Sequence, residues 1–190
     1  MAITMKRKGY GQVEPNHLSG IVTGQIYAQL PAATTKTVTN GVTTYSGIVR
    51  LEQGQFAKYD YAAGKVNFNG EGEFMLVYNE EKLYDERKQS HKDFVYKVED
   101  FTDEQMYPRL IKTNIGDILT TNTIAVANDS DTAVVGTVSL TVGDKLQPDT
   151  ADGFLKKATG ENLTGMVWKV VKETTMPDGQ PGVKIQRIQW

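Results

Sequence analysis

Two Asn-Gly pairs, each placed between runs of β-branched and aromatic residues, constrain the fold more than any other feature of this sequence. Asn-Gly supplies the two positive-φ residues that a two-residue type I′ hairpin needs, and β-branched side chains favour the extended chain on both sides. The pairs are Asn40-Gly41 and Asn69-Gly70. They predict one hairpin between residues 34–39 and 42–51, and another between residues 65–68 and 73–78.

Turn residues later in the chain predict two further hairpins. A polar cluster at residues 128–131 divides the run of small and β-branched residues that extends from 118 to 142. Near the end of the sequence, residues 166–172 and 183–190 flank a turn rich in Pro and Gly.

The spacing of these turns predicts the fold class. Bulky apolar residues alternate along the last run, and the alternation slips between Ile185 and Ile188, which predicts a β-bulge there. Recurrent turns between short alternating runs, with few helical patterns, are typical of antiparallel strands. We therefore predict a mainly β protein, an antiparallel β-barrel or β-sandwich, whose body covers residues 21–190.

Helical patterns are confined to one part of the chain. Residues 79–91 combine good helix formers with opposite charges at i, i+3 and i+4, which predicts a short exposed helix. A second helical turn is expected at residues 102–107, with Thr102 as its N-cap and Pro108 beyond its end. Together they predict a helical insertion at residues 79–107 of the β-rich body.

Residues 1–20 differ from the rest of the chain. They contain three glycines and a proline, show little apolar periodicity and carry no acid before Glu14. We predict an extended N-terminal arm outside the core. The candidate partner-binding residues of this arm are Lys6, Arg7, Lys8, Tyr10 and His17.

Charge also distinguishes this arm from the body. Residues 113–152 carry six Asp and a single basic residue, Lys145. An arm of one sign and a body of the other are expected when copies, or a copy and a partner, dock by complementary charge. A basic terminus that only keeps the chain soluble is the alternative.

The composition offers little for catalysis. There is no cysteine, and the two histidines, His17 and His91, lie neither in a G-x-S-x-G context nor at metal-ligand spacing. Carboxylates are plentiful, but no pair stands out as an acid and its base. We therefore predict no catalytic residues, no metal, no cofactor and a protein that is not an enzyme.

Charge and hydropathy also limit the partners. Lys and Arg number 21 against 23 Asp and Glu, so no overall positive field gathers a polyanion, and specific nucleic-acid binding is not expected. No apolar stretch approaches the roughly 20 residues needed to cross a bilayer, and no secretory signal is recognisable. The chain is expected to be soluble and made in a cytoplasm.

Four stretches of the chain, residues 8–20, 23–31, 99–101 and 116–122, read KGYGQVEPNHLSG, TGQIYAQLP, EDF and GDILTTN. With these stretches the chain resembles small head proteins of tailed bacteriophages that decorate or cement the capsid. The resemblance implies a β-rich, non-catalytic structural protein of the virion that binds the outside of the capsid and bridges major capsid subunits. It further implies a homo-oligomer, with a trimer as the expected state, and a terminal arm that grips neighbouring subunits, a role for which residues 1–20 are the candidate.

Two other functional interpretations of the sequence remain open. The first is a phage tail-tube or head-tail connector subunit, which would assemble into rings or tubes. The second is a carbohydrate-binding β-sandwich module in which exposed aromatic residues stack on sugar rings. The candidate aromatic residues are Tyr45, Tyr59, Tyr61 and Trp168, and core packing explains them equally well.

Overall fold

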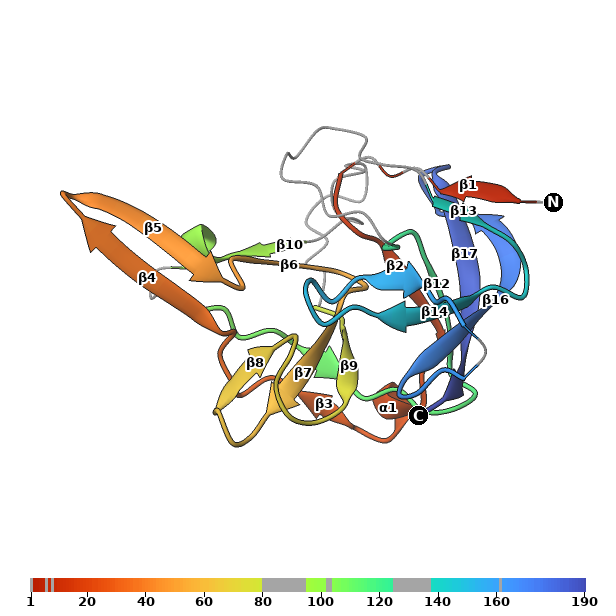
Figure 1. Ribbon diagram of the computed structural model, residues 1–190, viewed down its shortest axis with the longest axis horizontal. Helices are drawn as coiled ribbons and strands as arrows, with labels where there is room; N and C mark the ends of the chain where they lie inside the picture. The colour runs from red at the N-terminus through yellow and green to blue at the C-terminus, as the bar shows by residue number, and fades with distance from the viewer. Residues whose placement is uncertain are drawn as a thin grey trace.

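A computed structural model describes residues 2–5, 7, 9–79, 95–101, 104–124, 138–160 and 162–190. In this part of the chain the protein is mainly β, with two larger antiparallel sheets (Figure 1). The five-stranded sheet has the order β3 (Ile26–Tyr27), β11 (Leu110–Ile111), β9 (Phe74–Val77), β7 (Phe56–Asp60) and β8 (Lys65–Asn67). The six-stranded sheet has the order β15 (Leu155–Lys157), β14 (Lys145–Pro148), β16 (Val167–Thr175), β17 (Pro181–Gln189), β12 (Ile118–Thr121) and β2 (Val13–His17).

Three two-stranded sheets complete the described β structure. They are β4 (Thr34–Thr39) with β5 (Val42–Gly47), β6 (Arg50–Glu52) with β10 (Val95–Lys97), and β1 (Ile3–Met5) with β13 (Val138–Leu140). Among the described residues, helix is limited to α1 (Ser19–Val22) and a 3₁₀ turn, η2 (Val98–Asp100). None of the described sheets closes into a barrel, so the barrel alternative is wrong for this part of the chain.

The two larger sheets share one apolar core, and the five-stranded sheet is covered on both faces. Successive side chains of a strand point to opposite faces. Along β7, Phe56 therefore enters the core shared with Trp168 of β16, while Ala57 and Tyr59 face a second buried cluster. This double burial explains why β9 is entirely apolar and why β7 has apolar residues at every position except Lys58 and the terminal Asp60.

The first and last hairpins are confirmed. Asn40 and Gly41 have φ of 54° and 78°, as a type I′ turn requires, and β4 pairs with β5 in continuous register. β16 pairs with β17 over most of their length. The pairing moves from Gln189 to Arg187 across one step of β16, which leaves Ile188 unpaired and confirms the bulge near this position.

The prediction of a hairpin at Asn69-Gly70 is wrong. The flanking strands form, but β8 and β9 pair with opposite edges of β7 and not with each other. A local hydrogen bond explains the turn: the Asn67 side chain accepts from the N–H of Gly70 at 2.6 Å, which bends the chain without pairing its two arms. Asp60 and Lys65 instead pair across the turn at residues 61–64, so β8 takes one edge of β7 and β9 takes the other.

The hairpin around residues 128–131 is also not formed by the described strands. Both edges of β12 are occupied, by β17 and β2, while β13 pairs with β1. The turn itself lies outside the described residues, which resume at residue 138. β12 and β13 are strands within this run, as predicted, but their partners are distant in sequence.

The helical insertion at residues 79–107 is not seen where the structure describes it. Residues 80–91 of the expected helix lie outside the described residues, as does Thr102. Residues 104–107 are not helical, because Glu104 adopts a φ of 55°, a left-handed conformation that ends any helix. The described part of the insertion contains β10 and η2 instead.

The extended N-terminal arm is not observed either. β1 and β2 belong to sheets, and Met5, Val13 and Leu18 are buried in the shared core. The glycines that indicated an arm mark close packing: a Cβ on Gly11 would lie 2.3 Å from Thr123 Oγ1. Only a residue without a side chain fits there, and glycine therefore signals contact with the body.

Candidate assembly interface

The predicted partner-binding residues of the N-terminal segment do not form an exposed surface. Arg7 is 7% exposed, and its Nη1 lies 2.8 Å from the buried carboxylate of Glu52. Tyr10 is half-buried, with Lys97 Nζ 5.4 Å from its ring centroid, and His17 is exposed at the end of β2. Lys6 and Lys8 lie outside the described residues. Arg7 therefore joins this segment to β6 and is not available to a partner.

The β4–β5 hairpin is the most exposed element of the described chain. It projects from the body along the longest axis of the molecule, at the left of Figure 1. Most of its residues are exposed, and Val38 and Val42 beside the turn are 59% and 62% exposed. Val38 and Val42 lie on opposite faces of the tip, so a partner would have to enclose the tip to cover both.

One face of this hairpin carries no charge. Paired residues share a face, so each face consists of alternate pairs. This uncharged face contains Thr35, Thr37, Thr39, Val42, Thr44 and Ser46. Hydroxyl groups and methyl groups alternate along it, which suits packing against another sheet or strand.

The opposite face is joined to the body near its base. Lys36 Nζ donates to Glu104 Oε1 at 2.6 Å. This hydrogen bond raises the pKa of the Lys36 ammonium and lowers the pKa of the Glu104 carboxyl. At the base of the hairpin, the N–H of Ile48 donates to the backbone oxygen of Ala33 at 2.9 Å. The hairpin is therefore held at its base and free at its tip.

The register shows which backbone groups of β5 face outward. Thr39 and Val42 close a two-residue loop and exchange both hydrogen bonds, and such pairs alternate with pairs that exchange none. The N–H and C=O groups of Thr43 and Tyr45 consequently point away from β4. No other described strand pairs with this edge.

The outer edges of the two larger sheets are short or blocked. Proteins protect free edges with short strands, Lys, Pro or bulges. β3 has two residues, β8 has three and begins with Lys65, β15 ends with two lysines, and β2 contains Pro15 beside a register shift. β5 has six residues, no charge, no proline and no bulge. Its edge is therefore open to another strand.

The aromatic residues of the carbohydrate-binding alternative are mostly inside the protein. Trp168 is fully buried and Tyr59 is 4% exposed, while Tyr45 is half-buried. Tyr61 alone among the four is well exposed, at 72%. These four residues therefore do not form a common sugar-stacking surface.

Sequence reasoning identified the hairpin as an element but not as an interface. The signal was present: residues 34–47 carry one charged residue, Lys36, and Thr or Val occurs on both faces. A strand with one buried face alternates between apolar and polar residues, and these strands do not.

The described residues contain no group of three metal-ligating side chains, and no helix among them has the length and apolar character of a membrane span. No protein-family model, curated protein or solved structure matches this chain.

Proposed function

We propose that this chain is a non-catalytic structural protein of a virus particle, which binds the outside of the capsid and stabilises it by bridging major capsid subunits. The observation that carries the proposal is the β4–β5 hairpin, an exposed element with an uncharged face and an open edge. The resemblance of residues 8–20 and 116–122 to phage decoration proteins supports the same role.

Strand addition is the docking mode that this hairpin supports best. A partner strand that pairs with β5 satisfies the outward N–H and C=O groups of Thr43 and Tyr45. Val38 and Val42, exposed on opposite faces of the tip, would be covered by the same partner. The hairpin thus takes the role that the sequence assigned to residues 1–20.

Oligomerisation on the shell would strengthen this contact. A trimer presents three hairpins, so each hairpin that binds raises the effective concentration of the others. Because the protein binds the assembled shell and not the free subunit, it stabilises the shell by mass action.

The test compares particles assembled with and without the protein. The expected result is retention of the chain on purified particles and a higher melting temperature of the shell. Thr43→Pro removes an outward N–H from β5 but no hydrogen bond of the hairpin itself, and it should reduce the copy number per particle. Thr43→Val keeps the N–H and the extended chain, so it should bind as the unchanged protein does.

The proposal fails if particles melt equally with and without the protein and none is retained after purification. If Thr43→Pro and Thr43→Val are retained equally, the capsid role survives but strand addition at β5 is wrong.

A tail-tube or head-tail connector subunit is the second candidate, because an uncharged edge also suits pairing between identical copies. Size-exclusion chromatography of the pure protein separates the two roles. Rings or tubes support the tail or connector role, and monomers or trimers support decoration.

A further inference from the structure

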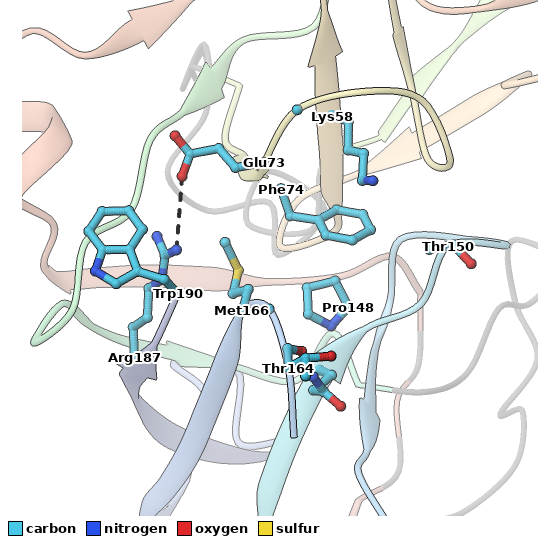
Figure 2. A pocket seen from close by; sticks show the side chains of 12 residues that line it. Lys58, Glu73, Phe74, Pro148, Thr150, Thr164, Met166, Arg187 and Trp190 are labelled. Atoms are coloured by element: carbon cyan, nitrogen blue, oxygen red, sulfur yellow. Dashed lines mark hydrogen bonds and ion pairs between the residues drawn. The ribbon is translucent and has the colours of Figure 1, made fainter. Parts of the chain in front are cut away.

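A groove with a volume of about 420 Å³ opens between the two larger sheets (Figure 2). Glu73 and Phe74, at the start of β9, lie on one side of it. Met166, which precedes β16, and Arg187 of β17 lie on the other side, with Trp190 beside them. Its volume lies in the range of roughly 300 to 1,000 Å³ that is typical of small-molecule sites.

Trp190 is an exposed aromatic ring that is held in place. It is 54% exposed, whereas the other tryptophan, Trp168, is fully buried. The Arg187 guanidinium lies 4.5 Å from the centroid of its indole ring, and Lys112 Nζ lies at 5.9 Å. Cations at these distances are attracted to the ring and restrict its motion. The indole therefore forms a preorganised stacking surface at the groove.

Arg187 brings a buried charge to the same place. Its side chain is 1% exposed, and Nη1 binds the backbone oxygen and the hydroxyl of Thr113. Nη2 lies 3.9 Å from Glu73 Oε2, which is too long for a hydrogen bond. Buried charges are normally fully hydrogen-bonded, so an acceptor that displaces Glu73 from Nη2 would complete the hydrogen bonds of this guanidinium.

The charge around the groove favours an anion. Lys58 and Arg187 are its basic lining residues, and Glu73 is its acidic one. The Glu73 carboxylate is also bound by Lys112 at 2.5 Å, which neutralises it locally. The groove is therefore basic in a chain whose net charge is −2.

Neutral polar groups lie beside the aromatic ones. Thr150 and Thr164 bring hydroxyl groups to the lining, and Gln147 brings an amide that donates to Thr164 O at 2.7 Å. Met166 and Pro148 make the floor apolar (Figure 2). Flat apolar surfaces flanked by hydroxyl and amide groups match a sugar ring, which has apolar C–H faces and polar edges.

We propose that this groove binds a carboxylate-bearing saccharide, of the uronic-acid or sialic-acid kind. A sugar ring stacks on Trp190, its carboxylate accepts from Arg187 Nη2, and its hydroxyls bond to Thr150 and Thr164. The site is separate from the β4–β5 hairpin, so the test of saccharide binding is independent of the test of the capsid role.

NMR titration of the full chain tests the site directly, because the protein has only two indole N–H signals. The probes are trigalacturonate and 3′-sialyllactose, with lactose as the neutral control and an acidic pentapeptide as the alternative ligand. We expect saturable binding of at least one acidic saccharide, with a shift of the Trp190 signal and none of the buried Trp168 signal. Lactose and the peptide should bind far more weakly.

Three variants locate the binding. Trp190→Ala should weaken it about tenfold, a loss of about 1.4 kcal/mol in stacking. Tyr61→Ala, which removes an aromatic side chain that is 72% exposed and lies outside the groove lining, should leave it unchanged. Glu73→Gln keeps the shape of the rim but removes the carboxylate that competes for Arg187, and it should tighten binding.

The proposal is overturned if neither acidic saccharide saturates the protein at millimolar concentration, or if lactose binds as tightly as 3′-sialyllactose. It is equally overturned if the peptide binds and the saccharides do not, or if Trp190→Ala leaves the affinity unchanged. Substitution of Arg187 would also disturb the fold, because Arg187 binds Thr113. The positive charge of the groove is therefore tested with Lys58→Gln, which should weaken binding of the acidic saccharides.

Discussion

Deletion of residues 1–20 should unfold most of this protein. Met5, Val13 and Leu18 are 3%, 8% and 4% exposed and belong to the core shared by the two larger sheets. Burial of one such side chain contributes about 2 kcal/mol, so the three contribute about 6 kcal/mol. The segment is a structural part of the body.

The deletion also removes the partners of a buried carboxylate. Glu52 is 1% exposed and accepts from the N–H of Gly11 at 2.8 Å, with Arg7 Nη1 at the same distance. Arg50 Nε remains 3.6 Å from Glu52 Oε1, but loss of the two closer partners of this buried charge costs about 3 kcal/mol. The total loss of about 9 kcal/mol lies within the range of about 5–15 kcal/mol for the whole stability of a typical domain.

Urea unfolding followed by tryptophan fluorescence measures this loss, because Trp168 reports on the shared core. Deletion of residues 1–2 is the matched control, since Ala2 is exposed and precedes β1, and it should cost about 1 kcal/mol or less. A cooperative transition of the longer deletion within about 1 kcal/mol of the full chain would refute the reasoning.

Three further predictions concern local structure. Gly54→Ala should destabilise the protein by about 2 kcal/mol or more, because its φ is 84° and a Cβ would lie 2.6 Å from Thr123 Oγ1. Gly116→Ala, with a φ of 96° but no atom within 4 Å, should cost only about 1 kcal/mol in the same urea assay. Gly41→Val places a β-branched residue at a φ of 78°, so limited proteolysis should cut the β4–β5 hairpin faster while the urea midpoint of the body stays unchanged. Hydrogen bonds from Ala63 N–H and the Asn67 amide lower the pKa of Asp60 below its ordinary value of 3.8, so its contribution to stability is complete above that pH and is lost as the pH falls through the lower folded-state value. Acid unfolding of Asp60→Asn should accordingly depend less on pH below about 4, and an unchanged dependence would contradict this assignment.

The chemistry of turns determined the fold class before any contact was known. Asn40-Gly41 closes its hairpin because the two residues tolerate positive φ wherever they occur, and the bulge near Ile188 follows from a break in apolar alternation. Both depend on neighbours in sequence, which is why sequence reasoning located them.

Strand partners were decided by tertiary structure. β8 and β9 are strands, as predicted, but β8 pairs with β7 across the turn at residues 61–64, and β9 pairs with the other edge of β7. The apolar periodicity of residues 1–20 is too weak to predict that this segment belongs to the core. Three of its side chains are nevertheless buried among distant strands. Such burial depends on the volume that remoter residues leave, and no local pattern encodes it.

The two candidate sites also differ in how much of each the sequence alone could show. The hairpin interface lies within residues 34–47, and its lack of alternation was visible in the sequence. The groove gathers Lys58, Glu73 and Arg187 from separate strands, so only the packing of one sheet on the other brings their charges together. Charge and stacking act over a few ångströms in space, and a sequence orders residues only along the chain.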